Sequence, residues 1–484
     1  MNTTVLNKIK SDKILSKILT IFPNGDIYLV GGMVRDLFMG KNSYDRDLIV
    51  TNIDAKSFAE KLHKNFNSAF IPLDEENNIY RIVLKDSENI HEPQMIDITN
   101  PEGNSLERDL MRRDLTINAI AINIKTGEII DLFGGIADIK NKTLNYIEEI
   151  NFVDDPLRLL RVYRFQANLN FELGADTIHA VCKYTDLISK PAKERVLYEL
   201  MKLFNGKYCA EALLNMNKTW LLEEIFPVVK ELKQVPPNSH HHLDLLHHSI
   251  ETVNQIQLLY DEADEKVKAH LDKVDFGGFS RLAHLKLAGF LHDIGKFSTW
   301  TIDKETGRHR FIKHDDVGSK MVKPLLKSLT CSNKQIEYIS EMIKYHIYPS
   351  SMMQEPEINE KAMLRYIRKL QDNAIDNIIL AKADRLSARG EVITEEMVEN
   401  NMKALDRLMK FYFDSQEKLK PLPKLLDGNE VMEILNIKEG KVLGNILKSL
   451  KEAQLDGDIN TKDEALTFVQ ECYREINTCK AKNS

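Results

Sequence analysis

The pattern of apolar and polar positions divides the chain into a strand-rich first part and a helical remainder. Over the first 145 or so residues, short runs of β-branched and apolar residues alternate with turns, which is typical of strands. These runs are DIYLVGG (26–32), DRDLIVT (45–51), NIYRIVL (78–84), QMIDIT (94–99) and INAIAINIKTGEIIDLFGG (117–135). From about Asp154 onward, apolar residues recur at spacings of three and four, which predicts an almost wholly helical region. The predicted fold class is therefore α+β, with a small mixed α/β head and an all-α remainder.

Local signals refine this division. Two apolar runs flank Lys125, Thr126 and Gly127, which predicts a β-hairpin whose turn needs the positive φ of glycine. Residues 1–22 mix lysine into apolar positions and predict an amphipathic helix rather than a signal peptide. Breaks in the helical pattern predict linkers at Pro191, 235–238, 275–278 and 421–423.

Composition and charge limit the class of protein. The 484 residues suggest about three domains at roughly 150 residues each. The 66 basic and 73 acidic residues give a net charge of −7, which argues against nonspecific coating of nucleic acid but allows a local basic groove. No apolar run is long enough to span a bilayer, and the five scattered cysteines form no C-x-x-C pair. We therefore expect a soluble, cytoplasmic protein without disulfides.

A Gly-Gly turn and a pair of aspartates give the first candidate site. The first predicted strand ends in Gly31 and Gly32, and a helix starting near Met33 would offer N–H groups and a positive dipole end to phosphate. Asp45 and Asp47 lie two apart on a predicted strand and therefore point to the same face. Two such carboxylates can hold Mg²⁺ beside a triphosphate. An isolated Asp-x-Asp would more often be a solvated strand edge, but the turn upstream favours the metal site.

Five ordered motifs make the first part resemble a known family. They are GGMVRD (31–36), DRD (45–47), RRDLTINAIA (112–121), DLFGG (131–135) and DDPLRLLRVYRF (154–165). The set resembles the class II tRNA nucleotidyltransferase and bacterial poly(A) polymerase superfamily. Asp97, on the run 94–99, is a candidate third acidic group near the metals or a turn-facing residue at a strand end. The resemblance implies a nucleotidyltransferase head in which Asp45 and Asp47 bind two Mg²⁺ ions. It also implies nucleotide contacts from Gly32, Arg35, Arg113 and Asp114.

The stretch 154–165 carries a chemistry of its own. Arginines spaced by three on a helix drift slowly round one side and form a row suited to polyphosphate; these are Arg158, Arg161 and Arg164. In the family that this stretch resembles, the second acid and the following arginine read the base edge of CTP or ATP, a role that falls on Asp155 and Arg158. A carboxylate acceptor and a guanidinium donor can satisfy a base edge without a template strand. Asp154 stands where the family usually has Glu, so base preference stays open.

The helical half contains a second constellation of histidines and aspartates. Its segments are LLHHSIET (245–252), LAGFLHDIGKF (287–297), RFIKHDDVGSKM (310–321), KYHIYP (344–349) and AKADRLSARG (381–390). Imidazole and carboxylate suit Mn, Mg, Ni, Co, Fe or Zn, and neighbouring helices can bring such side chains to one point. Most isolated histidines are surface or satisfied core residues, but five ordered segments favour a metal site.

This order of segments resembles the HD phosphohydrolase superfamily, whose pattern is His, His-Asp and Asp. The resemblance implies a divalent transition metal or Mg²⁺ held by His248, His292, Asp293 and Asp384. It places His314 and His346 where binuclear members carry two further histidines. Lys296 is a candidate phosphate ligand, and Gly295 is expected where a helix end passes close to a ligand. The neighbouring histidines are expected to be exposed: His240, His241, His242 and His247.

The two constellations together predict a bifunctional enzyme. Bacterial tRNA nucleotidyltransferases with an HD domain combine CCA addition with phosphodiesterase, nucleotidase or phosphatase activity. The resemblance implies that this chain adds CCA, or part of it, to tRNA 3′ ends from CTP and ATP and repairs damaged ends at the HD site. A poly(A) polymerase is an alternative, although the near-neutral C-terminus lacks the basic extension common in those enzymes. An HD phosphohydrolase with a nucleotide-sensing head is another, and the presence of Asp45 and Asp47 argues against it.

The expected organisation has four parts. Residues 1–145 form the nucleotidyltransferase head and 146–234 a helical neck that selects nucleotide and binds RNA. Residues 235–400 form the HD domain and 401–484 a helical segment that binds RNA or caps the fold. CC-adding and A-adding enzymes share these motifs and differ in a flexible loop, which falls on residues 85–111 and which one sequence does not classify. The expected partners are tRNA, CTP and ATP, with no membrane, and the oligomeric state stays open.

Overall fold

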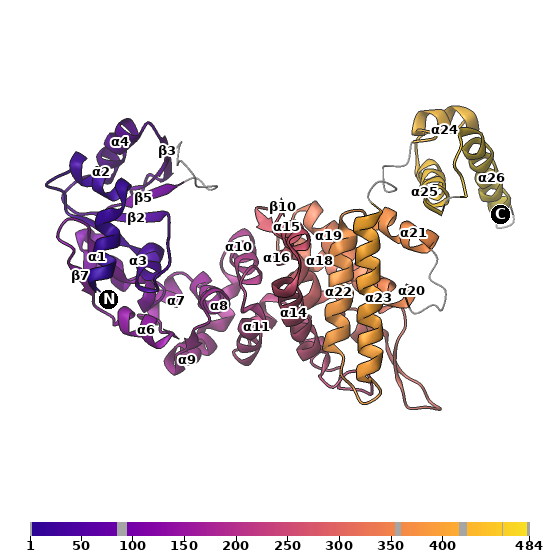
Figure 1. The fold of residues 1–484 in the computed structure, drawn as a ribbon, viewed down its shortest axis with the longest axis horizontal. Coiled ribbons are helices and arrows are strands. Elements are labelled where there is room, and N and C mark those ends of the chain that lie inside the picture. Colours follow the sequence, from indigo (N-terminus) through magenta and orange to yellow (C-terminus); the bar gives the residue numbers. More distant parts are fainter. Residues whose placement is uncertain (1, 85–93, 354–359, 416–423, 457, 482–484) are drawn as a thin grey trace. The chain divides into compact units, whose positions relative to one another are not determined.

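The computed structural model describes residues 2–84, 94–353, 360–415, 424–456 and 458–481 (Figure 1). By their contacts the residues group into two units, Met1–Glu231 with Leu325–Ser332, and Leu232–Pro324 with Asn333–Ser484. The first unit contains a sheet with helices before, among and after its strands, whereas the second is helical apart from two short hairpins. This arrangement confirms the predicted α+β class. None of the described helices is long and apolar enough to cross a membrane.

The head is built on a seven-stranded sheet in the order β3-β4-β5-β2-β1-β6-β7. Its strands are β1 (Ile27–Val30), β2 (Asp45–Val50), β3 (Ala69–Asp74), β4 (Ile79–Val83), β5 (Met95–Thr99), β6 (Ile120–Asn123) and β7 (Ile129–Asp131). Neighbours are antiparallel except for the parallel pair β2 and β5. Every predicted run contains a strand. Prediction missed β3 because Pro72 interrupts its apolar run, and β3 is an edge strand where proline is tolerated.

The hairpin predicted around Gly127 is present. β6 and β7 pair in antiparallel register, with Ile120 opposite Asp131 and Ile122 opposite Ile129. Gly127 has a φ of +76°, which side chains of L-residues rarely permit. The turn therefore depends on the glycine, as expected.

The N-terminal region forms two helices where one was predicted. α1 (Asn2–Ser11) ends and α2 (Lys13–Ile21) begins on either side of Asp12. The Asp12 carboxylate accepts hydrogen bonds from the backbone of Ile14 and Leu15, and it also lies 2.6 Å from the Arg46 guanidinium. This single side chain caps α2 and ties it to β2, and such a long-range ion pair leaves no periodic signal in the sequence.

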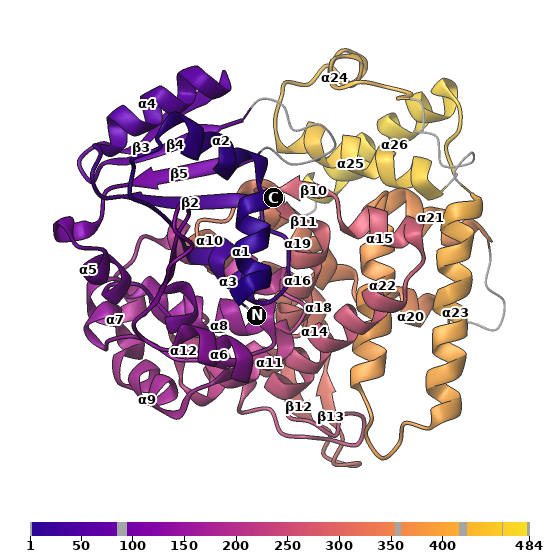
Figure 2. The ribbon, with the colours of Figure 1, turned by 60° about the vertical axis from the view of Figure 1, so that its left-hand side comes forward.

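The helices of the head lie against its sheet. α3 (Gly31–Phe38) contacts β1, β2 and β6, and α4 (Ala55–Phe66) contacts β3, β4 and β5, beside which Figure 2 shows it. The flexible loop that differs between CC-adding and A-adding enzymes was placed on residues 85–111, whose described part contains β5, predicted as a strand, and α5 (Leu106–Met111), which was not predicted. Residues 85–93 lie outside the described residues.

Helices follow the head up to the end of the first unit. They are α6 (Gly135–Asn141), α7 (Ile150–Asp154), α8 (Leu157–Leu169), α9 (Ala175–Tyr184), α10 (Lys193–Phe204), α11 (Cys209–Lys218), α12 (Leu221–Ile225) and α13 (Val229–Leu232). A short parallel pair, β8 (Thr143–Leu144) and β9 (Glu172–Leu173), lies among them. The helix predicted over 154–165 is broken at Asp155, which adopts an extended conformation before Pro156. α8 therefore carries the arginines and packs against α10 and α11.

The second unit is a helical assembly around α14, α16 and α22. Its helices are α14 (Leu245–Glu262), α15 (Glu265–Leu271), α16 (Arg281–Leu291), α17 (Lys296–Thr299), α18 (His314–Ser328), α19 (Asn333–Tyr345), α20 (Tyr348–Met352), α21 (Glu360–Leu370), α22 (Asn373–Ser387), α23 (Glu395–Asp414), α24 (Gly428–Leu435), α25 (Lys441–Asp456) and α26 (Lys462–Ala481). Two hairpins interrupt them: β10 (Val274–Phe276) with β11 (Phe279–Ser280), and β12 (Trp300–Ile302) with β13 (His309–Phe311). The linker predicted at 275–278 is wrong. Gly277 and Gly278, both with positive φ, form the turn of a hairpin there. The linker predicted at 421–423 lies outside the described residues.

Candidate nucleotide and metal sites

A cavity of about 1030 Å³ in the first unit is lined by motifs from widely separated parts of the sequence. The glycine turn, β2, the region around α5 and α8 each contribute side chains. All ten residues predicted for nucleotide transfer line it: Gly32, Arg35, Asp45, Asp47, Arg113, Asp114, Asp155, Arg158, Arg161 and Arg164. The fold thus brings the predicted site residues together, while the role of each stays a prediction.

The acidic pair occupies one face of β2. Between the two aspartates, Arg46 is only 4% exposed and donates to Asp12 and Gln94, so it lies on the opposite face. Asp97 on β5 is opposite Asp47 in the parallel register. Both oxygens of Asp97 accept hydrogen bonds from Arg81 at 2.7 Å. Asp97 is therefore a third acidic group beside the pair, and its ion-pair partner is Arg81.

Burial makes the acidic pair unfavourable as bare carboxylates. It raises the pKa of Asp47 to about 7, and Arg113 opposes this rise less strongly while Asp45 and Asp97 add to it. Burial and then Asp97 also raise the pKa of Asp45, against which Lys202 acts among other cations. Mg²⁺ typically binds through one or two carboxylates together with substrate phosphates. Asp45 and Asp47 lie beside a cavity, and nearby cations only partly offset their burial, so they fit that mode of binding.

Gly31 is the residue of this site that sequence reasoning undervalued. It has a φ of +73°, and a Cβ placed on it would lie 2.5 Å from Oδ2 of Asp47. Gly32, by contrast, would bring its Cβ no closer than 3.6 Å to the Arg35 side chain. The first glycine therefore allows the start of α3 to approach the acidic pair. The Gly-Gly sequence signalled a close approach but not which residue made it.

The arginine row on α8 is held by acidic neighbours. Arg161 lies 2.6 Å from Asp114, and Arg164 lies 3.2 Å from Glu199. Asp114 is buried and also accepts hydrogen bonds from the Leu115 backbone and the Asn118 amide. Its carboxylate thus fixes Arg161 while it lines the cavity.

Against the effect of burial, Asp114 and Glu199 raise the pKa of Arg161, whereas burial lowers the pKa of the other two arginines in the row. Together with the charge of Arg161, burial lowers the pKa of Arg164 to about 10. Burial likewise lowers the pKa of Arg158. Closely spaced, desolvated guanidinium groups gain from an added anion, which suits a polyphosphate.

Two further contacts concern the residues predicted to read the base. Arg195 lies 3.1 Å from Asp155, and Arg158 donates to the backbone oxygen of Asn151 at 3.0 Å. The Asn151 amide in turn donates to the backbone oxygens of Met111 and Arg113. One asparagine therefore joins helix α8 to the RRD motif.

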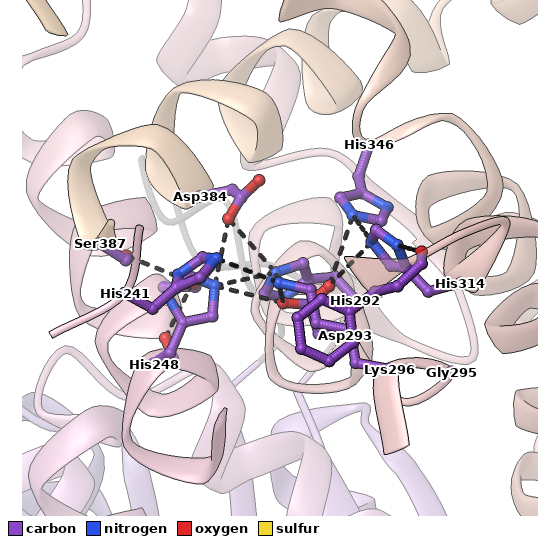
Figure 3. A network of polar contacts seen from close by, with 12 residues as sticks. His241, His248, His292, Asp293, Gly295, Lys296, His314, His346, Asp384 and Ser387 are labelled. Carbon is purple, nitrogen blue, oxygen red and sulfur yellow. Dashed lines mark hydrogen bonds and ion pairs between the residues drawn. The ribbon is translucent and has the colours of Figure 1, made fainter. Parts of the chain in front are cut away.

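The predicted HD residues converge in the second unit (Figure 3). α14 supplies His248, the end of α16 supplies His292 and Asp293, and α22 supplies Asp384. Nε2 of His248 lies 3.3 Å from Asp293 and 3.1 Å from Asp384, and Nε2 of His292 lies 3.1 Å from Asp293. These four form one group of metal-type ligands.

Asp293 also belongs to a second group. Its Oδ1 lies 3.2 Å from Nε2 of His314 and 3.6 Å from Nε2 of His346, whereas its Oδ2 faces His248 and His292. Each oxygen of one carboxylate thus serves a different group. Among the described residues, three or more metal-type ligands converge only in these two groups.

Hydrogen bonds show that these histidines suit a cation. His292, His314 and His346 each donate Nδ1–H to a backbone carbonyl, at 2.7, 2.8 and 2.6 Å. A neutral ring held in this way carries its lone pair on Nε2, yet Nε2 of His314 and His346 face each other at 3.3 Å. A divalent cation between such atoms removes the repulsion. Burial alone would lower the pKa of His292, but Asp293 and Asp384 raise it to about 10, so the cluster favours positive charge at its centre.

His241 was expected to be exposed, and that expectation is wrong. Its ring centroid lies 4.5 Å from that of His248, and its Nε2 lies 3.3 Å from Nζ of Lys296. Burial and Lys296 lower the pKa of His241 to about 2. The turn 238–241 reaches the site because 390–392 hold it through backbone hydrogen bonds, a long-range contact without a local signal. His240 and His242 are exposed and His247 is half-buried.

The structure adds contacts to two smaller predictions about this site, which stay predictions. Lys296 lies 2.6 Å from Oδ2 of Asp293, so its ammonium is engaged by a candidate metal ligand. A Cβ on Gly295 would lie 2.2 Å from the backbone oxygen of His314. That glycine therefore permits the close approach of α18, which positions His314.

Known families match the parts of the chain that carry the two candidate sites. Residues 27–145 match the Poly A polymerase head domain, 170–233 the probable RNA and SrmB-binding site of polymerase A, and 245–389 the HD domain. An A-adding tRNA nucleotidyltransferase of Deinococcus radiodurans is 32% identical over 94% of this chain and 97% of its own. A CC-adding tRNA nucleotidyltransferase of Thermus thermophilus is also 32% identical, over 92% of this chain and 93% of its own.

The fold is likewise shared with solved structures. The Thermotoga maritima CCA-adding enzyme complexed with tRNA matches with a TM-score of 0.58 at 20% identity, covering 97% of this chain and 98% of that one. A CCA-adding enzyme with ATP matches with a TM-score of 0.60 at 21% identity, covering 96% and 97%. Given 32% identity over almost the whole chain, the protein is a nucleotidyltransferase that belongs to the tRNA nucleotidyltransferase family with a poly(A)-polymerase-type head and an HD domain.

Proposed function

We propose that the protein is a cytoplasmic, template-independent tRNA nucleotidyltransferase that adds CCA, or part of it, to tRNA 3′ ends from CTP and ATP. The observation that carries this proposal is the single cavity that joins the acidic pair of β2, the glycine turn and the arginine row of α8. The two relatives named above are A-adding and CC-adding and are equally identical to this chain, so they do not favour one product.

In this proposal, Asp45 and Asp47 hold two Mg²⁺ ions. Magnesium bound there would activate the acceptor hydroxyl and stabilise the departing pyrophosphate. The N–H groups at the start of α3 and the guanidinium groups of Arg161 and Arg164 bind the triphosphate. Asp155 and Arg158 pair with the base edge, and Asp155 exchanges its partner Arg195 for the base as it does so.

The test is an extension assay read at single-nucleotide resolution. Purified protein and Mg²⁺ are incubated with a tRNA that lacks CCA, a tRNA that ends in CC and an unrelated RNA, with CTP and ATP separately and together. Three residues added to the first substrate indicate complete CCA addition, whereas two C or one terminal A indicates a partial activity. Long A tails on every RNA would instead indicate a poly(A) polymerase. No addition to any RNA would contradict the proposal and leave the HD hydrolase as the working function.

We also propose that the HD cluster hydrolyses phosphate esters at RNA 3′ ends with a divalent transition metal or Mg²⁺. The two ligand groups that share Asp293 support this second activity. The four-part division at residues 145, 234 and 400 remains a proposal as well. The three matched family ranges, 27–145, 170–233 and 245–389, fall inside its first three parts and support it.

Gly31→Ala is expected to lower the rate of nucleotide addition at least about tenfold. The new methyl group would overlap Oδ2 of Asp47 and displace one of the two proposed magnesium ligands, and small displacements of catalytic groups cost about 10²-fold in rate. The measurement is the single-turnover rate of nucleotide addition at saturating Mg²⁺. Gly40→Ala is the matched control, because Gly40 also has positive φ, +77°, but has nothing within 4 Å of its Cβ position. Equal losses in the two variants would assign the effect to backbone strain.

A further inference from the structure

One face of α10 forms a second wall of the nucleotide cavity. Arg195, Tyr198, Lys202 and Asn205 line the cavity and are spaced by three and four residues, as side chains on one face of a helix are. The opposite face of α10 is buried in the core through Val196, Leu200 and Leu203. Packing therefore fixes the direction of the cavity-lining side chains.

Tyr198 and Lys202 have an arrangement that core packing does not explain. Tyr198 is 50% exposed although it is a large aromatic residue, and Nζ of Lys202 lies 4.3 Å from the centre of its ring. A cation over an aromatic ring restrains the orientation of both side chains. The pair therefore presents a ring and an ammonium to a polar cavity.

The position of this pair within the cavity indicates what it meets. α8 supplies the groups proposed to hold the incoming nucleotide, and Asp45, with Asp47, forms the proposed magnesium site. Lys202 and Asp45 both line this cavity. Tyr198 and Lys202 line the same cavity as the metal pair, which an acceptor hydroxyl has to reach, and Glu199 on the same helix pairs with the arginine row. The cavity of about 1030 Å³ is slightly larger than the roughly 300–1,000 Å³ of single-ligand pockets, so it has room for a second nucleotide.

We propose that Tyr198 and Lys202 bind the 3′-terminal nucleotide of the acceptor RNA. The Tyr198 ring stacks on the terminal base, and the Lys202 ammonium binds the phosphate on its 5′ side. Aromatic stacking tolerates every base, which suits an acceptor end whose identity changes as nucleotides are added. The assignment rests on the proposed nucleotidyl transfer to tRNA and adds to it the residues that hold the acceptor.

The test compares Tyr198→Ala and Tyr198→Phe with the unmodified protein. Tyr198→Ala is expected to raise KM for the RNA acceptor by about 5- to 150-fold, because it removes the stacking of one base. It is expected to leave KM for CTP and ATP unchanged. Tyr198→Phe keeps the ring and is expected to stay within about twofold of the unmodified protein. Tyr184→Ala is the matched control, because Tyr184 also has a lysine over its ring, at 4.9 Å, but does not line the cavity.

An acceptor RNA with an abasic 3′-terminal nucleotide makes the test specific. If the ring stacks on that base, the abasic RNA and Tyr198→Ala each weaken binding, and together they weaken it no further. Additive losses, or a rise in KM for nucleotide instead of RNA, would overturn the assignment.

A binding assay separates this assignment from the proposed function. RNA that carries 2-aminopurine as its last base should lose fluorescence on binding to the unmodified protein and not on binding to Tyr198→Ala. This readout needs no turnover. An absence of nucleotide addition would therefore contradict the proposed function alone, and unchanged quenching by Tyr198→Ala would contradict the stacking role alone.

Discussion

Asp45→Ala is expected to lower the rate of nucleotide addition at least about 10³-fold, which corresponds to about 4 kcal/mol of transition-state stabilisation. The loss is large because β2 offers two carboxylates on this face, and one alone would have to hold both proposed magnesium ions. Hydrolysis at the HD cluster is expected to continue unchanged, since none of the HD residues lies in the head. The measurement is the single-turnover rate of CTP or ATP incorporation into tRNA, with phosphate release at the HD cluster assayed in parallel.

Asp74→Ala is the matched control for this experiment. Asp74 is the last residue of β3 at the edge of the same sheet, and its carboxylate accepts hydrogen bonds from Asn77. Asp74→Ala removes one carboxylate from the sheet at a residue that does not line the cavity. A comparable loss of nucleotide addition in both variants would show that Asp45 acts through the stability of the head rather than at the reacting atoms.

The double substitution His292→Ala with Asp293→Ala is expected to abolish hydrolysis at the HD cluster and to remove its bound metal. Asp293 contributes one oxygen to each ligand group, so its loss affects both. The measurements are the metal-to-protein ratio by elemental analysis and the hydrolysis of RNA that ends in a 2′,3′-cyclic phosphate. Nucleotide addition is expected to remain within about twofold of the unmodified protein.

Two further variants keep this second prediction open to refutation. Asp384→Asn removes one charge at a partly exposed position and is expected to weaken metal binding. It provides the test if the double variant fails to fold. His247→Ala is the control, because His247 precedes His248 on α14 but pairs with Asp244 outside the two ligand groups. If a folded variant of either Asp45 or the HD pair lost both activities, the hypothesis of two independent sites would be wrong.

Spacing along the chain predicted the parts of both sites that depend on one element. The period of a strand placed Asp45 and Asp47 on one face, and the period of a helix placed Arg158, Arg161 and Arg164 along one cavity. Six of the seven strands of the sheet, all but β3, and the helical second half were predicted for the same reason. These features follow from local geometry, which a sequence pattern records directly.

Features that depend on contacts between distant segments could not be predicted. His241 reaches the HD cluster only because its turn is bonded to residues 390–392. Gly31 matters through its distance to Asp47, and Glu199 matters because it holds Arg164 from another helix. In each case the deciding quantity is a separation in space between segments far apart in sequence. The resemblance to known families supplied the HD ligands, whereas geometry identified the residues that support them.

The hydrogen bonds of Asn151 have a consequence for how such a protein can evolve. Its amide holds the backbone at Met111 and Arg113, and its backbone oxygen accepts from Arg158. A substitution that moves this residue disturbs both the RRD segment and the helix proposed to read the base. A mutation that alters nucleotide choice by moving Asn151 therefore also displaces the backbone at Met111 and Arg113. Lineages that change their preferred base should acquire compensating substitutions in pairs, one near residue 112 and one near residue 158.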